Sequence, residues 1–260
     1  MNMVRISLKT MAASSAGILL MIVIVSALNA PIYTMAPRMK RDTTTSTNWS
    51  GYVISASSGS VTGVKGSWIV PAVQSGTPSG SYSSFWVGID GFSSTTVEQI
   101  GTDSDMTSSG PVYYAWFEFY PHPAYYVPIT VNAGDIISAE VSYSGKSFTV
   151  KITDVTTGES WSTSSKANQA KRSSAEWIAE APYSGGILPL ADFGTVDFGH
   201  QYTGVSGTCY ATIGGTTGDI GAFNSAPITM VTSAGAVKAY PSPLSSGGDS
   251  FTITWVSSGP

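Results

Sequence analysis

The stretch "DIISAEVSYSGKSFTVKITDVTTGE", from Asp135 to Glu159, decides the fold. In both of its halves a hydrophobic side chain recurs at every second position: at Ile137, Ala139, Val141 and Tyr143, then at Phe148, Val150 and Ile152. This period places the hydrophobic side chains on one face of a β-strand. The segments "SGK" and "TTGE" are turn signals. The stretch therefore predicts two antiparallel strands that share one buried face.

Similar short strands are predicted along most of the chain, separated by turn signals. They are "GVKGSWIVPAV" (63–73), "SYSSFWVGID" (81–90), "VYYAWFEFY" (112–120), "PITV" (128–131), "SAEWIAEA" (174–181), "VDFG" (196–199), "APITMV" (226–231) and "DSFTITWV" (249–256). No helical crossover separates them. The pattern predicts an all-β protein whose strands form a single antiparallel sandwich.

The N-terminal region differs from the rest of the chain. Arg5 and Lys9 precede the apolar run "AGILLMIVIVSALNA", from Ala16 to Ala30, which ends in small residues. Residues 1–30 predict an export signal that is cleaved, so that the protein is secreted; the alternative is an uncleaved membrane anchor with the domain facing outside. Residues 31–47, rich in Thr and basic in the middle, predict a linker or short pro-segment. Residues 48–260 predict one domain.

The charge pattern excludes one class of partner. Charged residues make up 11% of the chain, against about a quarter in ordinary globular proteins. From Asn48 onward, seven basic residues stand against fifteen acidic ones. No basic patch remains to neutralise phosphates, so nucleic-acid binding is not expected.

Few residue types remain for catalysis. The chain has two histidines and no HExxH motif, so neither a metal nor another cofactor is expected. Cys209 is the single cysteine; it is expected to be buried and cannot form an internal disulfide. No GxSxG motif is present. Carboxyl groups are left as the acid–base groups, above all those among apolar residues, where pKa values rise: Glu98, Glu118, Glu176 and Glu180.

Strand periodicity assigns these acids to faces. One face carries a mixture of rings, small residues and polar groups: Trp86, Gly88 and Asp90; Val97, Gln99 and Gly101; Tyr114, Trp116, Glu118 and Tyr120; and Glu176, Ile178 and Glu180. The other face of each strand is mostly apolar or small. If the mixed faces belong to one curved sheet, they form a groove floored by Trp86 and Trp116. Periodicity does not decide between Glu176 and Glu180.

Six strings of the chain resemble the glutamic peptidases, or eqolisins, in order and at similar spacing. They are "NWSGYV" (48–53), "FWVGIDG" (85–91), "VEQIGTDSD" (97–105), "YYAWFEFYP" (113–121), "VNAGDIISAEV" (131–141) and "SAEWIAEAP" (174–182). "ADFGTVDF" (191–198) further resembles the segment that follows the catalytic glutamate in that family. The resemblance implies a sandwich of two curved antiparallel sheets, a jelly roll like that of legume lectins.

The resemblance also implies an activity and its residues. The family cleaves proteins at acidic pH with a glutamine and a glutamate, which correspond here to Gln99 and Glu176. Its cleft tryptophans correspond to Trp86 and Trp116, and its supporting acids to Asp90 and Glu118. Glu176 would activate a water molecule and then protonate the leaving nitrogen, while Gln99 would orient the water and stabilise the oxyanion. The expected partners are protein or peptide substrates, and the expected state is a monomer.

The chain departs from the family pattern at three places. Tyr114 stands where the best-known members carry an aspartate, and Ile100 stands where threonine is common. The chain also cannot form the disulfides of fungal members, which points to a prokaryotic relative.

Other readings of the same residues stay open. Trp86 and Trp116 could be core residues, Asp90 a turn-former and Glu118 a solvated strand residue. The alternative functions are a carbohydrate-binding surface sandwich and an inactive peptidase homologue.

Overall fold

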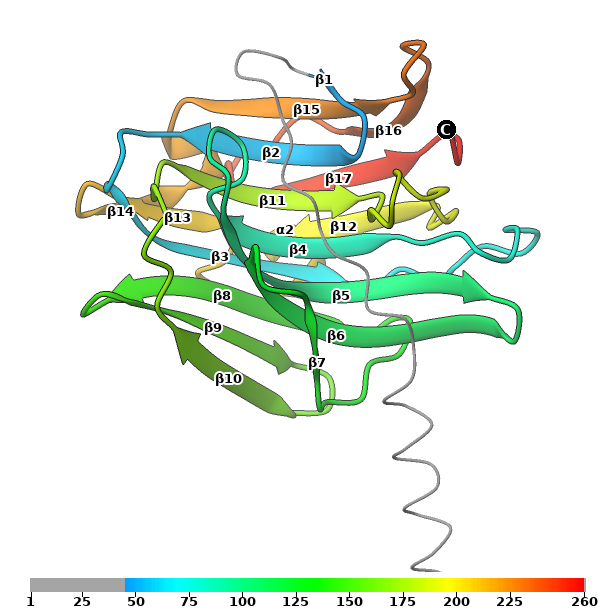
Figure 1. The fold of residues 1–260 in the computed structure, drawn as a ribbon, viewed down its shortest axis with the longest axis horizontal. Coiled ribbons are helices and arrows are strands. Elements are labelled where there is room, and N and C mark those ends of the chain that lie inside the picture. The colour runs from blue at the N-terminus through cyan, green and yellow to red at the C-terminus, as the bar shows by residue number, and fades with distance from the viewer. Residues whose placement is uncertain (1–44, 260) are drawn as a thin grey trace, which may run out of the picture. The chain divides into compact units, whose positions relative to one another are not determined.

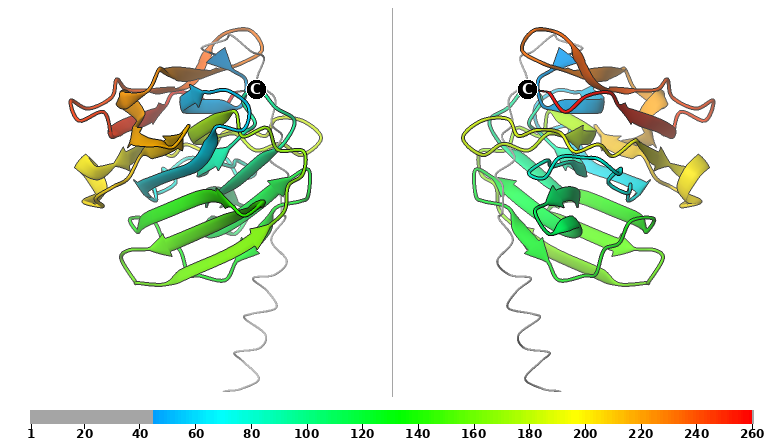
Figure 2. Two further views of the ribbon diagram at one scale, coloured as in Figure 1. Left: turned by 90° about the vertical axis from the view of Figure 1, so that its left-hand side faces the viewer. Right: turned by 90° about the vertical axis from the view of Figure 1, so that its right-hand side faces the viewer.

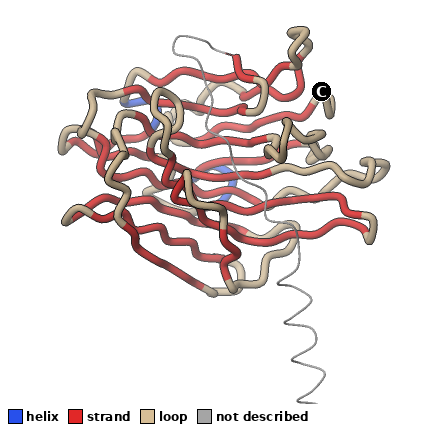
Figure 3. Tube along the Cα trace, viewed as in Figure 1, coloured by secondary structure: helices blue, strands red, loops and turns tan. Residues whose placement is uncertain are grey.

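A computed structural model describes residues 45–259. The predicted export signal or anchor at 1–30, and most of the predicted linker at 31–47, lie outside the described residues. The elements of the described part are almost all strands (Figure 3). Its helices are short: α2 (His200–Thr203) and the 3-10 turn η1 (Ile220–Ala222). No helix within residues 45–259 is long and apolar enough to cross a membrane.

The first sheet carries the strands on which the candidate residues lie (Figure 1). Its order is β15 (Ser225–Val231), β2 (Trp49–Ser55), β11 (Ser174–Glu180), β4 (Ser84–Ile89), β5 (Val97–Thr107), β6 (Gly110–Tyr120) and β7 (Tyr125–Val127). All of these neighbours are antiparallel. The central strands β11 and β4 are buried on both faces.

The second sheet contains the stretch that predicted the fold. Its order is β10 (Ser160–Ser165), β9 (Ser147–Asp154), β8 (Ile136–Ser144) and β3 (Val61–Ile69), followed by β12 (Thr195–Gly199), β17 (Ser250–Trp255) and β16 (Val237–Pro241). β13 (Tyr210–Ile213) also pairs with β3 and forms a hairpin with β14 (Thr216–Asp219). The two strands predicted within Asp135–Glu159, which are β8 and β9, are therefore adjacent and antiparallel.

The strand β15 belongs to both sheets. Its first residues pair with β2 and its last residues pair with β16. The short strand β1 (Thr45–Ser46) pairs with it in parallel, so sheet structure begins within the segment that the sequence assigns to a linker. Figure 2 shows the two groups of strands from the sides. The predicted all-β sandwich of antiparallel sheets is confirmed.

The main core lies between the sheets and takes its side chains from both. Phe85, Val87 and Ile100 of the first sheet belong to the same buried cluster as Trp68 and Phe198 of the second. The indole of Trp68 donates a 2.9 Å hydrogen bond to the hydroxyl of Thr102 across the interface. Cys209 is fully buried, as expected.

A second, smaller cluster lies on the opposite face of the first sheet. It contains Trp49, Trp86, Val97, Trp116 and Ile178. This is the mixed face that periodicity predicts, and each of its strands turns the other face to the main core. Ile100, at the position of the departure from the family pattern, faces the main core.

One predicted strand is wrong. The segment "PITV" (128–131) is irregular in the structure, although Val131 is buried. The amide of Asn132 already donates to the carboxyl group of Asp135, so a turn begins where the strand would have to find a partner. The chain therefore enters β8 from a turn.

Candidate active site

Four strands of the first sheet bring the predicted catalytic residues into one row. The register places Glu176 of β11 opposite Gly88 of β4, Gly88 opposite Gln99 of β5, and Gln99 opposite Glu118 of β6. Directly opposite residues point to the same face of a sheet. Glu176 and Gln99, which lie far apart in the sequence, are thus separated by a single strand.

Gly88 leaves the space between Glu176 and Gln99 without a side chain. A Cβ atom added at Gly88 would lie 2.8 Å from the Trp86 ring and 3.3 Å from the Cβ of Gln99. The first distance is a clash, so glycine is required at this point of the row. The Trp86 ring occupies the room beside the backbone of Gly88.

Gln99 and Glu118 are joined by a hydrogen bond. The amide nitrogen Nε2 of Gln99 donates to Oε2 of Glu118 over 2.7 Å, and both side chains are fully buried. Oε1 of Gln99 accepts no hydrogen bond from a described residue. Glu118 is therefore not a solvated strand residue: it orients the amide of Gln99, with Nε2 toward β6 and Oε1 left as an available acceptor.

Glu176 is buried without well-formed hydrogen bonds. Its exposed fraction is 0%, and neither carboxyl oxygen accepts a good hydrogen bond from a described residue. Burial raises its pKa well above the usual value, and the charges of Asp90 and Glu98 raise it further; the nearby Ser174 hydroxyl acts in the opposite direction. A buried carboxyl group without well-formed hydrogen bonds is costly for stability, which is a common property of functional acids.

Glu180 differs from Glu176 because its oxygens are already used. Oε1 accepts a 3.0 Å hydrogen bond from the amide of Asn48, and Oε2 accepts a 2.9 Å hydrogen bond from the indole of Trp86. Burial raises its pKa to about 8, although these donors lower it. The Trp86 ring also meets Trp49 edge-on, with centroids 5.0 Å apart. Glu180 therefore holds the ring that lies beside Gly88.

Asp90 fixes the start of β11. Its carboxyl group accepts hydrogen bonds from the backbone amides of Arg172 and Ser173, at 2.6 and 2.9 Å, and from the Ser173 hydroxyl at 3.1 Å. Its backbone has φ of 74°, in the left-handed region that aspartate tolerates better than most residues. Asp90 is both a turn residue and an anchor for the strand that carries Glu176.

Trp116 lies in the next row of the same face, opposite Gly101, which itself lies opposite Trp86. Its indole donates a hydrogen bond to Asp103, and its exposed fraction is 2%. Both tryptophans are therefore buried members of the second cluster as well as neighbours of the predicted catalytic row.

Comparisons with known proteins agree on the family of this chain. The model of the peptidase A4 family matches residues 47–255. Aspergillopepsin-2 from Aspergillus niger is 32% identical over 236 residues, which cover 81% of this chain and 78% of that protein. The chain belongs to the peptidase A4 family.

Solved structures of glutamic peptidases have the same fold. Scytalido-glutamic peptidase, solved with a transition state analog inhibitor, has a TM-score of 0.67 and 25% identity over 81% of this chain and 98% of its own. Aspergilloglutamic peptidase from Aspergillus niger has a TM-score of 0.57 and 33% identity over 68% of this chain and 99% of its own. The resemblance read from the sequence to the glutamic peptidases, or eqolisins, is confirmed.

The structure adds polar residues that sequence reasoning missed in this family member. Asp103 and Asp105 belong to the same face as Gln99, and the hydroxyl of Tyr114 contacts both of them. The alternation along this strand could have identified Asp103 and Asp105, because positions 99, 101, 103 and 105 lie on one face of it. Asn48, which holds Glu180, lies before the first residue of β2 and carries no such signal.

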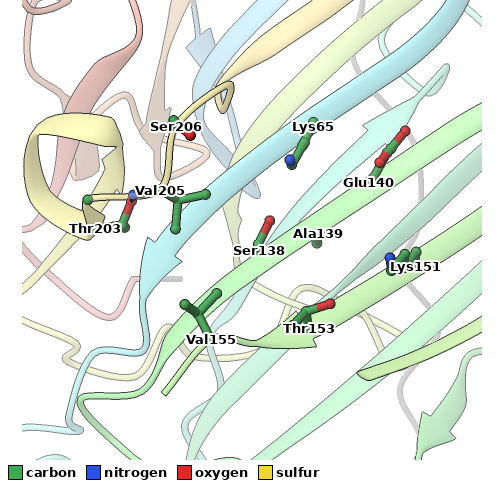
Figure 4. Close-up of a pocket in the computed structure, with 11 residues that line it drawn as sticks. Lys65, Ser138, Ala139, Glu140, Lys151, Thr153, Val155, Thr203, Val205 and Ser206 are labelled. Carbon is green, nitrogen blue, oxygen red and sulfur yellow. The ribbon is translucent and has the colours of Figure 1, made fainter. Parts of the chain in front are cut away.

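A surface pocket of about 440 Å³ lies elsewhere, on the second sheet (Figure 4). Lys65, Glu140 and Lys151 line it from three adjacent strands, together with residues beside α2. It contains none of the predicted catalytic residues. Among the residues that the structure describes, no group of three or more His, Cys, Asp or Glu could hold a metal ion.

Proposed function

We propose that this peptidase A4 member is an endopeptidase that acts at acidic pH through Glu176 and Gln99. The observation that carries the proposal is the row Glu176–Gly88–Gln99, in which a single glycine, without a side chain, separates an acid from an amide. A carbohydrate-binding sandwich has no need for a glutamine and a glutamate that converge in this way. The substrates proposed are proteins and peptides, since a relative, SCP-B, was solved with the tripeptide Ala-Ile-His.

Glu176 acts as the base and then as the acid. Its carboxylate takes a proton from the water molecule that attacks the scissile carbonyl, and the resulting acid gives the proton to the leaving nitrogen. Burial favours the protonated form, which suits the second step. The first step needs the ionised form, so water or substrate groups that reach the carboxyl oxygens must offset part of the burial. The acid limb of the pH–rate profile then reports the ionisation of Glu176.

Gln99 acts without a charge of its own. Its Nε2 carries two hydrogens, and Glu118 accepts one of them. The second hydrogen is available for the oxyanion of the tetrahedral intermediate, and Oε1 is available to orient the attacking water. Because an amide does not titrate, both contacts persist at acidic pH.

The proposal includes the cellular setting. We place the mature domain outside the cell, with the segment 1–30 removed as an export signal and the protein monomeric. The domain uses no disulfide, metal or cofactor in the proposed reaction. N-terminal sequencing of the protein recovered from the culture medium, compared with the membrane fraction, tests the cleavage.

The test of the activity is digestion of an acid-unfolded protein across roughly pH 2 to 7. The wild type is expected to cleave at acidic pH, and Glu176→Gln and Gln99→Ala are expected to lose this cleavage while their circular dichroism spectra stay unchanged. Loss of cleavage in Glu180→Gln, with Glu176→Gln still active, would assign the reaction to the other acid. A wild type that cleaves nothing would favour the inactive homologue, and glycan binding would be measured next.

A further inference from the structure

The side chains of Asp103, Tyr114 and Asp105 form a cluster at one end of the face that carries Gln99. The cluster has two close oxygen–oxygen contacts, and the phenol hydrogen can serve only one of them. The phenol oxygen of Tyr114 lies 2.8 Å from Oδ2 of Asp103 and 2.9 Å from Oδ2 of Asp105. Both aspartates are buried, each with an exposed fraction of 2%. A phenol has one hydrogen and can donate to one carboxylate only. The second contact is a hydrogen bond only if that carboxyl group carries a proton and donates it to the phenol oxygen.

The remaining oxygens of the cluster bind residues of the proposed site. Oδ1 of Asp103 accepts the hydrogen bond from the indole of Trp116, and Oδ1 of Asp105 accepts one from the backbone amide of Ser83 at 3.2 Å. Ser83 directly precedes β4, the strand of Trp86 and Gly88. The cluster therefore joins β4, β5 and β6 at the end of the face that also carries the Glu176–Gln99 row.

The surroundings of the cluster supply little compensation for a second negative charge. Tyr126 of β7 packs edge-on against the Tyr114 ring, with centroids 5.0 Å apart. Glu180 of β11 is a further ionisable group that faces Asp103, and Ser83 and Ser84 face it from the β4 side. Burial raises the pKa of Asp103 to about 7 and that of Asp105 well above its usual value. One proton is therefore retained through the acidic range.

We infer that Asp103, Tyr114 and Asp105 form a proton-sharing bridge that positions Trp116 and β4 for the proposed peptidase reaction, and that the bridge holds only while it carries one carboxylic proton. Tyr114 and Asp105 are positioning residues in this scheme. They do not contact the reacting atoms. The inference rests on the proposed function for its kinetic consequences, but not for its effect on folding.

Three variants test the bridge. Asp105→Asn keeps the shape and replaces the acid proton with a permanent amide hydrogen that can donate to the phenol oxygen. Asp105→Ala removes the donor, and Tyr114→Phe removes the hydroxyl. Asp219→Asn, at a partly exposed aspartate outside the site, is the matched control.

The kinetic readout is the pH profile of kcat/KM. Asp105→Ala and Tyr114→Phe are expected to lower kcat/KM by about tenfold or more at acidic pH, because displacement of Trp116 and β4 misplaces the substrate. Asp105→Asn is expected to recover acid activity and to extend it toward neutral pH, whereas Asp219→Asn follows the wild type. Equal pH profiles for wild type and Asp105→Asn, or no recovery by the amide, would overturn the inference.

The folding readout does not need activity. The urea midpoint of the wild type is expected to fall as pH rises from about 4 to 7, and that of Asp105→Asn to fall less. Identical pH dependence in the two proteins would contradict the bridge, and so would an Asp105→Asn protein that fails to fold at about pH 4. A wild type that shows this folding behaviour but cleaves nothing would keep the bridge and refute the proposed function.

Discussion

Gly88 lies between Glu176 and Gln99 in the candidate active site, and the arrangement of the row requires that this position has no side chain. We expect Gly88→Ala to lower kcat/KM by about tenfold to a hundredfold, because the new methyl group would displace the Trp86 ring and press on Gln99. The cost in stability is expected to be about 1–3 kcal/mol, as for other overpacked sites. Kinetics and urea unfolding measure the two effects.

The control for Gly88→Ala is Gly63→Ala, also within a strand. There a Cβ atom would lie 3.4 Å from the nearest atom, in ordinary contact. It should change neither activity nor the urea midpoint by much. If Gly88→Ala behaved like this control, the space beside Gly88 would have no role in catalysis.

Glu180 is a separate case at the residue scale, because two donors converge on its carboxyl group. Glu180→Gln replaces one acceptor oxygen with an NH2 group, which would face either the Asn48 amide or the Trp86 indole. We expect a loss of about 1–3 kcal/mol in the free energy of unfolding, the usual cost of a buried donor left without an acceptor. Thermal or urea unfolding measures it. Glu140→Gln, on the surface of β8, should cost much less, and equal losses would show that the donors contribute nothing.

At the scale of elements, Asp90 connects the end of β4 to the start of β11. Asp90→Ala removes three accepted hydrogen bonds and leaves alanine at a positive φ. We expect it to destabilise the domain by about 2–4 kcal/mol, since the backbone amides left without an acceptor and the left-handed strain both contribute. Asp90→Asn, which tolerates this φ and keeps one acceptor oxygen, should recover part of the loss.

The measurement for Asp90 is urea unfolding at one pH, with activity assayed on the folded fraction. A lower kcat/KM in folded Asp90→Ala would show that the anchor also positions Glu176 through β11. If Asp90→Ala and Asp90→Asn were equally stable, the acceptor oxygen that asparagine keeps and its tolerance of the left-handed backbone would both be unimportant there.

Sequence patterns predicted the elements that have a hydrophobic alternation and missed those that do not. The strands that contain Ile137 or Phe148 are found because one side is buried in the main core. β10, "SWSTSS", and β14, "TTGD", are rich in Ser, Thr and Gly and partly exposed, so their pairing leaves little hydrophobic signal. β13, "YATI", has only four residues, which is too short for an alternation to stand out. "PITV" shows the reverse, since apolar residues do not make a strand where no partner strand is adjacent.

The candidate site shows which structural information the periodicity of a single sequence does not provide. Periodicity places Gln99 and Glu176 on the mixed faces of their own strands, but it does not say that β4 alone lies between those strands. That order comes from the long-range pairing of β11 with β4, across more than eighty residues of chain. The Tyr114 bridge depends on the register of β5 and β6 in the same way. The strand face on which each residue lies was predictable from the sequence. The proximity of the residues to one another required the fold or the family resemblance.

At the scale of the whole molecule, the domain buries an unusual set of carboxyl groups. Burial raises the pKa of Glu98 to about 9, of Glu180 to about 8 and of Asp103 to about 7. In the unfolded chain these groups ionise near pH 4. Between these values the native state binds more protons than the unfolded state, so the stability that they contribute is present at acidic pH and is lost as pH rises through the native pKa values.

This linkage predicts a domain that is most stable in acid. Each such group can remove up to about 1.4 kcal/mol of stability per pH unit, and the acidic excess of the domain adds repulsion as its carboxyl groups ionise. We expect the urea midpoint to fall steadily from about pH 4 to 8. Glu98→Gln replaces a buried acid, whose carboxyl oxygens accept no well-formed hydrogen bond from a described residue, by a neutral amide and should flatten the slope. A midpoint that rises toward neutral pH would mean that these acids are ionised in the native state, and it would contradict a domain that is most stable in acid.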